Sequence, residues 1–119
     1  MNKREKGGVF EEKAAEYLRG QGLVVLEKNY QTKLGEIDLI CKDGDTIVFV
    51  EVKYRKTNDY GEGMEAVDVK KIRKMYKTAE IYIALKRFKN CNFRFDCVSF
   101  LGSETKWLKH VIWGDEYGF

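Results

Sequence analysis

The chain has 119 residues, of which 44% are hydrophobic and 34% are charged, and its net charge at pH 7 is +3. This length predicts one domain, residues 1 to 119, with a core of its own. No uncharged apolar run is long enough for a membrane span or a signal peptide, so we expect a cytoplasmic protein without a membrane partner.

The chain is predicted to begin with a tail, a helix and a strand. Residues 1 to 8 hold three basic side chains and two glycines, so we expect a basic flexible tail. In residues 9 to 20 apolar residues recur at helical spacing and two glycines follow, which predicts a helix. Residues 23 to 27 are predicted to form the first strand.

The clearest local signal is a hairpin of two strands around Asp43-Gly44-Asp45. Short turns of Gly and Asp between apolar runs are typical of such hairpins. The pattern allows a two-residue turn at Gly44-Asp45, a two-residue turn at Asp43-Gly44, or a four-residue loop over residues 43 to 46. The sequence leaves these three turns open.

Each of these turns brings three charged side chains onto one face of the hairpin. Side chains alternate across a strand, so an even loop places Asp38 on the same face as Glu51 and Lys53, either directly opposite Glu51 or diagonal to it. An odd loop or a bulge would separate them.

The second half of the chain is predicted to hold a helix and two more strands. Residues 54 to 63 are rich in Gly, Asn and Asp and are predicted to form a mobile loop. Apolar residues at three- and four-residue steps predict a long amphipathic helix over residues 64 to 86. Alternation over residues 93 to 100 and an apolar run from 107 to 113 predict two strands. The order α-β-β-β-α-β-β indicates an α/β fold, a mixed sheet flanked by helices.

The cysteines and the histidine exclude several kinds of site. Cys41, Cys91 and Cys97 are odd in number and match no CxxC pattern, so they are interpreted as reduced core thiols. His110 is the only histidine, which disfavours zinc clusters and Ser/His/Asp catalysis. The sequence predicts no organic cofactor.

The charges of the hairpin favour a divalent metal. Two carboxylates held close together repel each other unless a cation lies between them, and Mg²⁺ is commonly held by one or two carboxylates. The ammonium of Lys53 could orient a water and offset charge on a phosphoryl group under attack. The alternative is an exposed charge ladder on the open face of a hairpin. Ile40 and Phe49 share that face and argue against it, because charges are costly on a partly buried face.

The same residues resemble a known nuclease core. Asp38, twelve residues, and then Glu51-Val52-Lys53 is similar to the D…ExK core of the PD-(D/E)xK nuclease superfamily, which includes restriction endonucleases and Holliday junction resolvases. The wider pattern resembles the YraN family, also called UPF0102, over residues 8 to 112. The matching motifs are an N-terminal helix with Glu and paired Ala, Asn29, GEIDLI, an aspartate-glycine turn, FVEVKYR, Ala66-Val67 before a basic helix, and RFDCV.

This resemblance implies a restriction-endonuclease-like domain that cuts DNA with Mg²⁺ or Mn²⁺. The metal ligands it implies are Asp38, Glu51 and the backbone carbonyl of Val52, and Lys53 is the catalytic lysine. An acidic residue of the first helix is implied as a further direct or water-mediated ligand.

The helical acid is either Glu11 or Glu12. The residue before it is Phe10, where the family usually has Gly, so the flanking residue does not fix the register. Glu11 shares its helix face with apolar residues, and this periodicity favours it over Glu12. Its alternative role is a solvated charge in the first turn of the helix.

Basic residues around this site are predicted to contact DNA phosphates and to read DNA shape, such as a branch or junction, in preference to sequence. The candidates are Arg55, Lys70, Lys71, Arg73 and Lys74. Glu36, on the face of Asp38, is a weaker candidate for the metal or the DNA. A homodimer is implied by the resolvase resemblance alone. The rival interpretation is a non-catalytic module that keeps the nuclease fold and binds nucleic acid or a protein.

Overall fold

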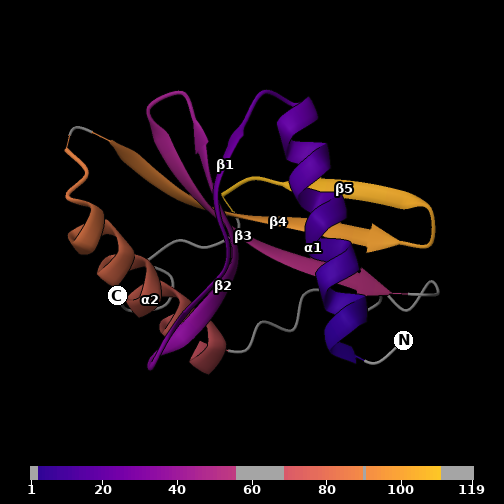
Figure 1. Ribbon diagram of the computed structural model, residues 1–119, viewed down its shortest axis with the longest axis horizontal. Coiled ribbons are helices and arrows are strands. Elements are labelled where there is room, and N and C mark those ends of the chain that lie inside the picture. The colour runs from indigo at the N-terminus through magenta and orange to yellow at the C-terminus, as the bar shows by residue number, and fades with distance from the viewer. Residues whose placement is uncertain (1–2, 56–68, 90, 111–119) are drawn as a thin grey trace.

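The computed structural model describes residues 3–55, 69–89 and 91–110 (Figure 1). Its elements follow one another in the predicted order α-β-β-β-α-β-β, so the predicted α/β fold with a mixed sheet flanked by helices is confirmed. The elements are α1 (Lys3–Gly20), β1 (Val24–Thr32), β2 (Gly35–Asp43), β3 (Thr46–Arg55), α2 (Val69–Lys86), β4 (Asn92–Leu101) and β5 (Glu104–Leu108). Neither of these two helices is long and apolar enough to cross a membrane, a finding that covers the described residues.

The five strands form one sheet in the order β1-β2-β3-β4-β5. Neighbouring strands are antiparallel except β3 and β4, which are parallel. Parallel neighbours need a long crossover, and α2 lies in the segment that connects them. The hairpin from β2 to β3 pairs Asp43 with Thr46, so its turn is Gly44-Asp45, one of the three predicted turns. Gly44 has φ +63°, as the first position of a type II′ turn requires.

The strands bury both of their faces, one under each helix. Val48 and Val50 pack with Leu18 of α1 in one core, whereas Ile47 and Phe49 pack against α2 in the other. This is the predicted alternation of β3, and it explains why the strand has apolar side chains at successive positions. From α2, Met75, Ala79 and Tyr82 belong to this second core, and Tyr76 and Ile83 pack against it.

Several predicted boundaries differ from the structure. The first helix begins at Lys3, so residues 3–8, which were expected in a flexible tail, are helical, and that expectation is wrong for them. A pair of glycines weakens a helix only by about 1 kcal/mol each, which the rest of a helix can offset. The first strand extends beyond residue 27 to Thr32. The last strand runs from Glu104 to Leu108, whereas the predicted run began at 107; residues 111 to 113 of that run lie outside the described residues.

Other predictions fall on residues that are not described. The expected loop over residues 54 to 63 lies there except for its first two residues, which end β3. The first residues of the predicted helix, 64 to 68, also lie outside the described residues, and α2 is described from Val69.

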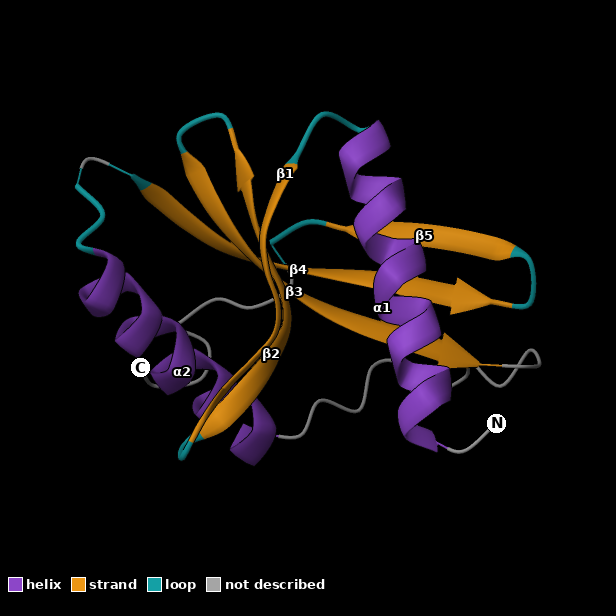
Figure 2. Cartoon of the chain, viewed as in Figure 1, coloured by secondary structure: helices purple, strands orange, loops and turns teal. Residues whose placement is uncertain are grey.

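The sheet opens into two arms in its middle. The pairing of β2 with β3 ends at Leu39 and Val50. Beyond this point β2 continues with β1 toward α2, and β3 continues with β4 and β5 under α1 (Figure 2). We call this opening, between Asp38 of β2 and Glu51-Val52 of β3, the fork. Gly35 lets the β1–β2 arm pack closely against α2. A Cβ added to Gly35 would lie 3.0 Å from the Cβ of Lys74 and 3.1 Å from the backbone carbonyl oxygen of Lys74.

Candidate active site

Asp38 lies at the start of the fork. Its Oδ2 accepts a 2.8 Å hydrogen bond from the backbone N–H of Val52. This bond replaces a strand-to-strand bond where β2 and β3 no longer pair. Burial, opposed by this hydrogen bond and joined by the charge of Glu51, raises the pKa of Asp38. The hydrogen bond therefore fixes the Asp38 carboxylate in position, while burial and the charge of Glu51 disfavour its ionised form.

A kink in the neighbouring strand accompanies the position of Asp38. Asn29 of β1 lies opposite it, between the pairs Lys28–Leu39 and Tyr30–Ile37, and has a left-handed φ of 50°. Alternation fails at the same level in β2, because Ile37 packs in the α2-side core while Leu39 packs in the α1-side core. Asp38 was predicted to share a face with Glu51 and Lys53 because side chains alternate along a strand. In β2 this alternation holds only from Leu39 to the turn. A bend at Asn29 and Asp38 sets the carboxylate in the fork.

We expect Asn29→Val to lower the free energy of unfolding by about 1 to 2 kcal/mol, because a β-branched residue is strained at positive φ whereas Asn tolerates it. Asn29→Gly is the matched control and should cost less than about half as much, since glycine adopts this φ freely. Urea denaturation measures both. Equal losses for the two variants would contradict a role for backbone conformation at this position.

Glu11 and Glu12 point to different partners. Glu11 is half-buried beside Asp38 and Glu36; burial, followed by the carboxylate of Asp38, raises its pKa to about 7. Glu12 instead forms ion pairs with Lys28 and Arg19 on the surface, and these lower its pKa. The structure places Glu11, the residue that periodicity favours, next to the fork.

The raised pKa of Glu11 predicts a pH-dependent stability. Protonation favours the folded state here, so this contribution is present below the ordinary pKa of 4.5 and is lost as the pH rises through about 7. Relative to the wild type, Glu11→Gln should gain about 1 kcal/mol between about pH 5 and about pH 8, a value discounted because the carboxyl is partly exposed. Denaturation in EDTA tests this, with the exposed Glu16→Gln of the same helix as control. A constant difference between Glu11→Gln and wild type would contradict it.

Glu51 and Lys53 line a hollow on the β3 side of the fork. The hollow has a volume of about 390 Å³ and is lined by Glu51, Val52, Lys53, Tyr54 and Lys71. The Glu51 carboxylate forms an ion pair with the ammonium of Lys71 from the first turn of α2. Lys53 is half-buried and forms no ion pair with any other described residue. Its ammonium is therefore available to a ligand in this hollow.

The oxygen atoms at the fork suit a hard divalent cation. Glu11, Asp38 and Glu51 come from three different elements; after burial, the charge of Asp38 raises the pKa of Glu11, and the charge of Glu51 helps to raise that of Asp38. Carboxylate and carbonyl oxygens are the ligands that Mg²⁺ and Mn²⁺ take. Within the described ranges no three His, Cys, Asp or Glu side chains already converge as a metal cluster. The donors fit such an ion, and Lys71 holds one of them.

The two buried thiols are unsuited to catalysis. Burial, followed by the charge of Glu51, raises the pKa of Cys97 to about 11, and burial raises that of Cys41 to about 12. A thiol with such a pKa is neither a nucleophile nor a metal ligand near neutral pH. All three cysteines are free, and Cys41 and Cys97 are buried, as predicted. Cys91 is only partly buried, so the prediction of a core thiol is wrong for it.

The predicted DNA-contacting residues are gathered on α2. Four of them are exposed in the first two turns of α2: Lys70, Lys71, Arg73 and Lys74. Arg55 ends β3, and its side chain lies outside the description. Glu36 is exposed, accepts a hydrogen bond from Gln31 and adds negative charge near Glu11 and Asp38.

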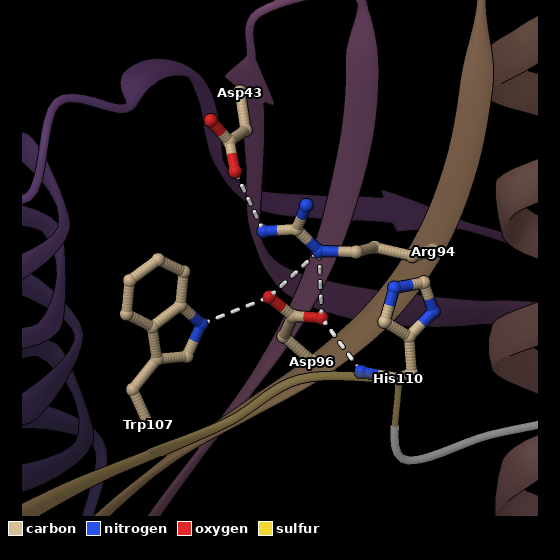
Figure 3. A network of polar contacts seen from close by, with 5 residues as sticks. All are labelled: Asp43, Arg94, Asp96, Trp107 and His110. Carbon is tan, nitrogen blue, oxygen red and sulfur yellow. Dashed lines mark hydrogen bonds and ion pairs between the residues drawn. The ribbon is translucent and has the colours of Figure 1, made fainter.

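A buried polar network behind the hairpin was not anticipated. Asp96 is 1% exposed, and its carboxylate accepts hydrogen bonds from Arg94 Nε (3.1 and 3.2 Å), Trp107 Nε1 (2.8 Å) and the backbone N–H of His110 (3.1 Å) (Figure 3). Arg94 also donates to Asp43 at 2.9 Å. One signal in the sequence could have indicated the network: Asp96 lies on the same face of β4 as the buried Val98, where a charge needs partners. The network joins the hairpin, β4 and the segment after β5.

Comparisons with known proteins agree on one family. The model of the family described as "Uncharacterised protein family UPF0102" matches residues 10–100. A UPF0102 protein of Fusobacterium nucleatum is 50% identical over 119 residues, all of both chains. One from Caldicellulosiruptor saccharolyticus is 47% identical over 82% of this chain and 83% of its own. One from Vibrio campbellii is 44% identical over 94% of this chain and 95% of its own.

Proposed function

Since the chain belongs to the UPF0102 family, as its motifs predicted, we propose that its fork is the active site of a metal-dependent endonuclease that hydrolyses DNA phosphodiester bonds. The observation that carries this proposal is that Asp38 of β2 interacts with Glu11 of α1 and with Glu51 of β3, next to a hollow that Lys53 and Lys71 line. Acidic ligands for a cation next to lysines that attract phosphate are what phosphodiester hydrolysis needs.

Each residue of the fork has a proposed role. Asp38, Glu51 and the carbonyl of Val52 would hold Mg²⁺ or Mn²⁺, with Glu11 as a direct or water-mediated ligand. When bound, the ion supplies Lewis-acid polarisation of a phosphoryl oxygen. The Lys53 ammonium orients the attacking water and offsets the negative charge that develops as the ester P–O bond breaks. The hydrogen bond from Val52 keeps the Asp38 carboxylate in place.

The substrate proposed for this site is branched or junction DNA in the cytoplasm. The exposed lysines and arginine of α2 would follow the phosphate backbone, a kind of contact that positions DNA without reading its bases. Binding should therefore weaken as the salt concentration rises. Two symmetric cuts at a junction would require two copies of the site, which a homodimer provides.

The test uses the purified chain with linear, flapped and four-way-junction DNA in Mg²⁺, Mn²⁺ or EDTA. We expect cutting that requires the metal, is faster on branched DNA, and falls by roughly a hundredfold or more in Asp38→Ala and Lys53→Ala. Glu80→Ala, an exposed position on α2, serves as control and should cut like the wild type. If the wild type cuts none of these substrates, and DNA binding survives both substitutions, the result would instead support a non-catalytic binding module.

A further inference from the structure

Lys71 forms an ion pair with Glu51, one of the proposed metal ligands. Its ammonium contacts the carboxylate of Glu51, whose side chain is only 17% exposed, whereas the side chain of Lys71 is 58% exposed. The carboxylate is thus held within the fork by β3, and the lysine reaches it from the solvent side on a flexible stem. Lys71 is the partner of this pair that can leave.

The same ammonium compensates the other acids of the fork. Burial alone would lower the pKa of Lys71, but the contact with Glu51 and the charges of Asp38 and Glu36 outweigh it and raise the pKa. In return, the charge of Lys71 favours ionised Asp38. A divalent ion at Glu51 would meet this ammonium at close range, and the two cations would repel each other. The metal and Lys71 therefore compete for Glu51.

A phosphate of bound DNA offers Lys71 another partner. Lys71 lies in the exposed basic row of α2 and lines the hollow next to Glu51 and Lys53. We infer that Lys71 is a positioning residue that holds Glu51 away from divalent ions until a DNA phosphate draws its ammonium off, so that DNA and metal strengthen each other's binding. This inference rests on the proposed function, since it takes the metal and the DNA as ligands of the same fork.

The experiment measures Mn²⁺ binding from the free-ion signal in electron paramagnetic resonance. Wild type, Lys71→Met, Lys71→Arg and the control Lys42→Met are titrated without DNA and with a short phosphorothioate duplex, against the duplex alone. Without DNA, Lys71→Met should bind Mn²⁺ about tenfold more tightly than wild type, because Glu51 is released. Lys71→Arg should bind no more tightly than wild type, and Lys42→Met, at an exposed lysine of β2, should match it.

The DNA arm gives the second readout. The duplex should raise the Mn²⁺ affinity of wild type at least about fivefold more than that of Lys71→Met, because the variant has no competitor to remove. Equal Mn²⁺ affinity of wild type and Lys71→Met without DNA would overturn the inference and leave the proposed metal site standing. Absence of Mn²⁺ binding in every variant, with and without DNA, would overturn both.

Discussion

Replacing Asp96 by alanine is expected to lower the free energy of unfolding by about 3 to 5 kcal/mol, a large part of the 5 to 15 kcal/mol typical of a domain. The substitution leaves Arg94, whose side chain is 8% exposed, with Asp43 as its remaining ion-pair partner among the described residues. It also removes the acceptor from Trp107 Nε1 and from the backbone N–H of His110. The loss of these two part-buried hydrogen bonds adds to the cost of the buried charge.

Urea denaturation of Asp96→Ala and of Glu80→Ala gives the comparison. The control removes one carboxylate from an exposed helix position and should stay within about 0.5 kcal/mol of wild type. Asp43→Ala should cost less than Asp96→Ala, because its side chain is 36% exposed and water can replace it at Arg94. A loss for Asp96→Ala no larger than that of the control would show that the network does not stabilise the fold.

The sequence allowed prediction of the parts of this fold that depend on neighbouring residues. The hairpin around Asp43-Gly44-Asp45 and the alternation of Ile47 to Val50 are local, and both are confirmed; the strand register selects Gly44-Asp45 from the three turns that the sequence left open. The helix periodicity that favoured Glu11 over Glu12 is local as well, and Glu11 indeed lies beside Asp38.

The rest depends on contacts between distant parts of the chain. The Asp96 network joins the hairpin to residues as far along as His110, and the ion pair of Lys71 with Glu51 crosses from α2 to β3. The left-handed backbone at Asn29 belongs to β1, but the interrupted alternation lies in β2, between Ile37 and Leu39. The residues of β2 alone therefore could not predict this interruption. Patterns of 2 or 3.6 residues carry no information on such pairings.

Asp38→Asn and Lys53→Met should separate metal binding from chemistry. Asparagine keeps an oxygen that can accept the hydrogen bond from Val52, so the fold is retained while a ligand charge is lost. We expect its Mn²⁺ affinity to fall about tenfold or more and DNA cutting to disappear with it. Lys53→Met should bind Mn²⁺ at least as tightly as wild type, since a nearby positive charge is removed, yet cut DNA roughly a hundred- to a thousandfold more slowly.

Calorimetry with Mn²⁺ and single-turnover cleavage at saturating metal measure the two effects independently. Lys42→Met, an exposed lysine of β2, is the matched control and should change neither. Saturating metal matters, because a defect of Asp38→Asn that arises from weak binding is partly recovered as Mn²⁺ rises, whereas the defect of Lys53→Met is not. Cutting by Lys53→Met that recovers with added metal would assign the lysine to metal retention, and its role toward the attacking water would then be wrong.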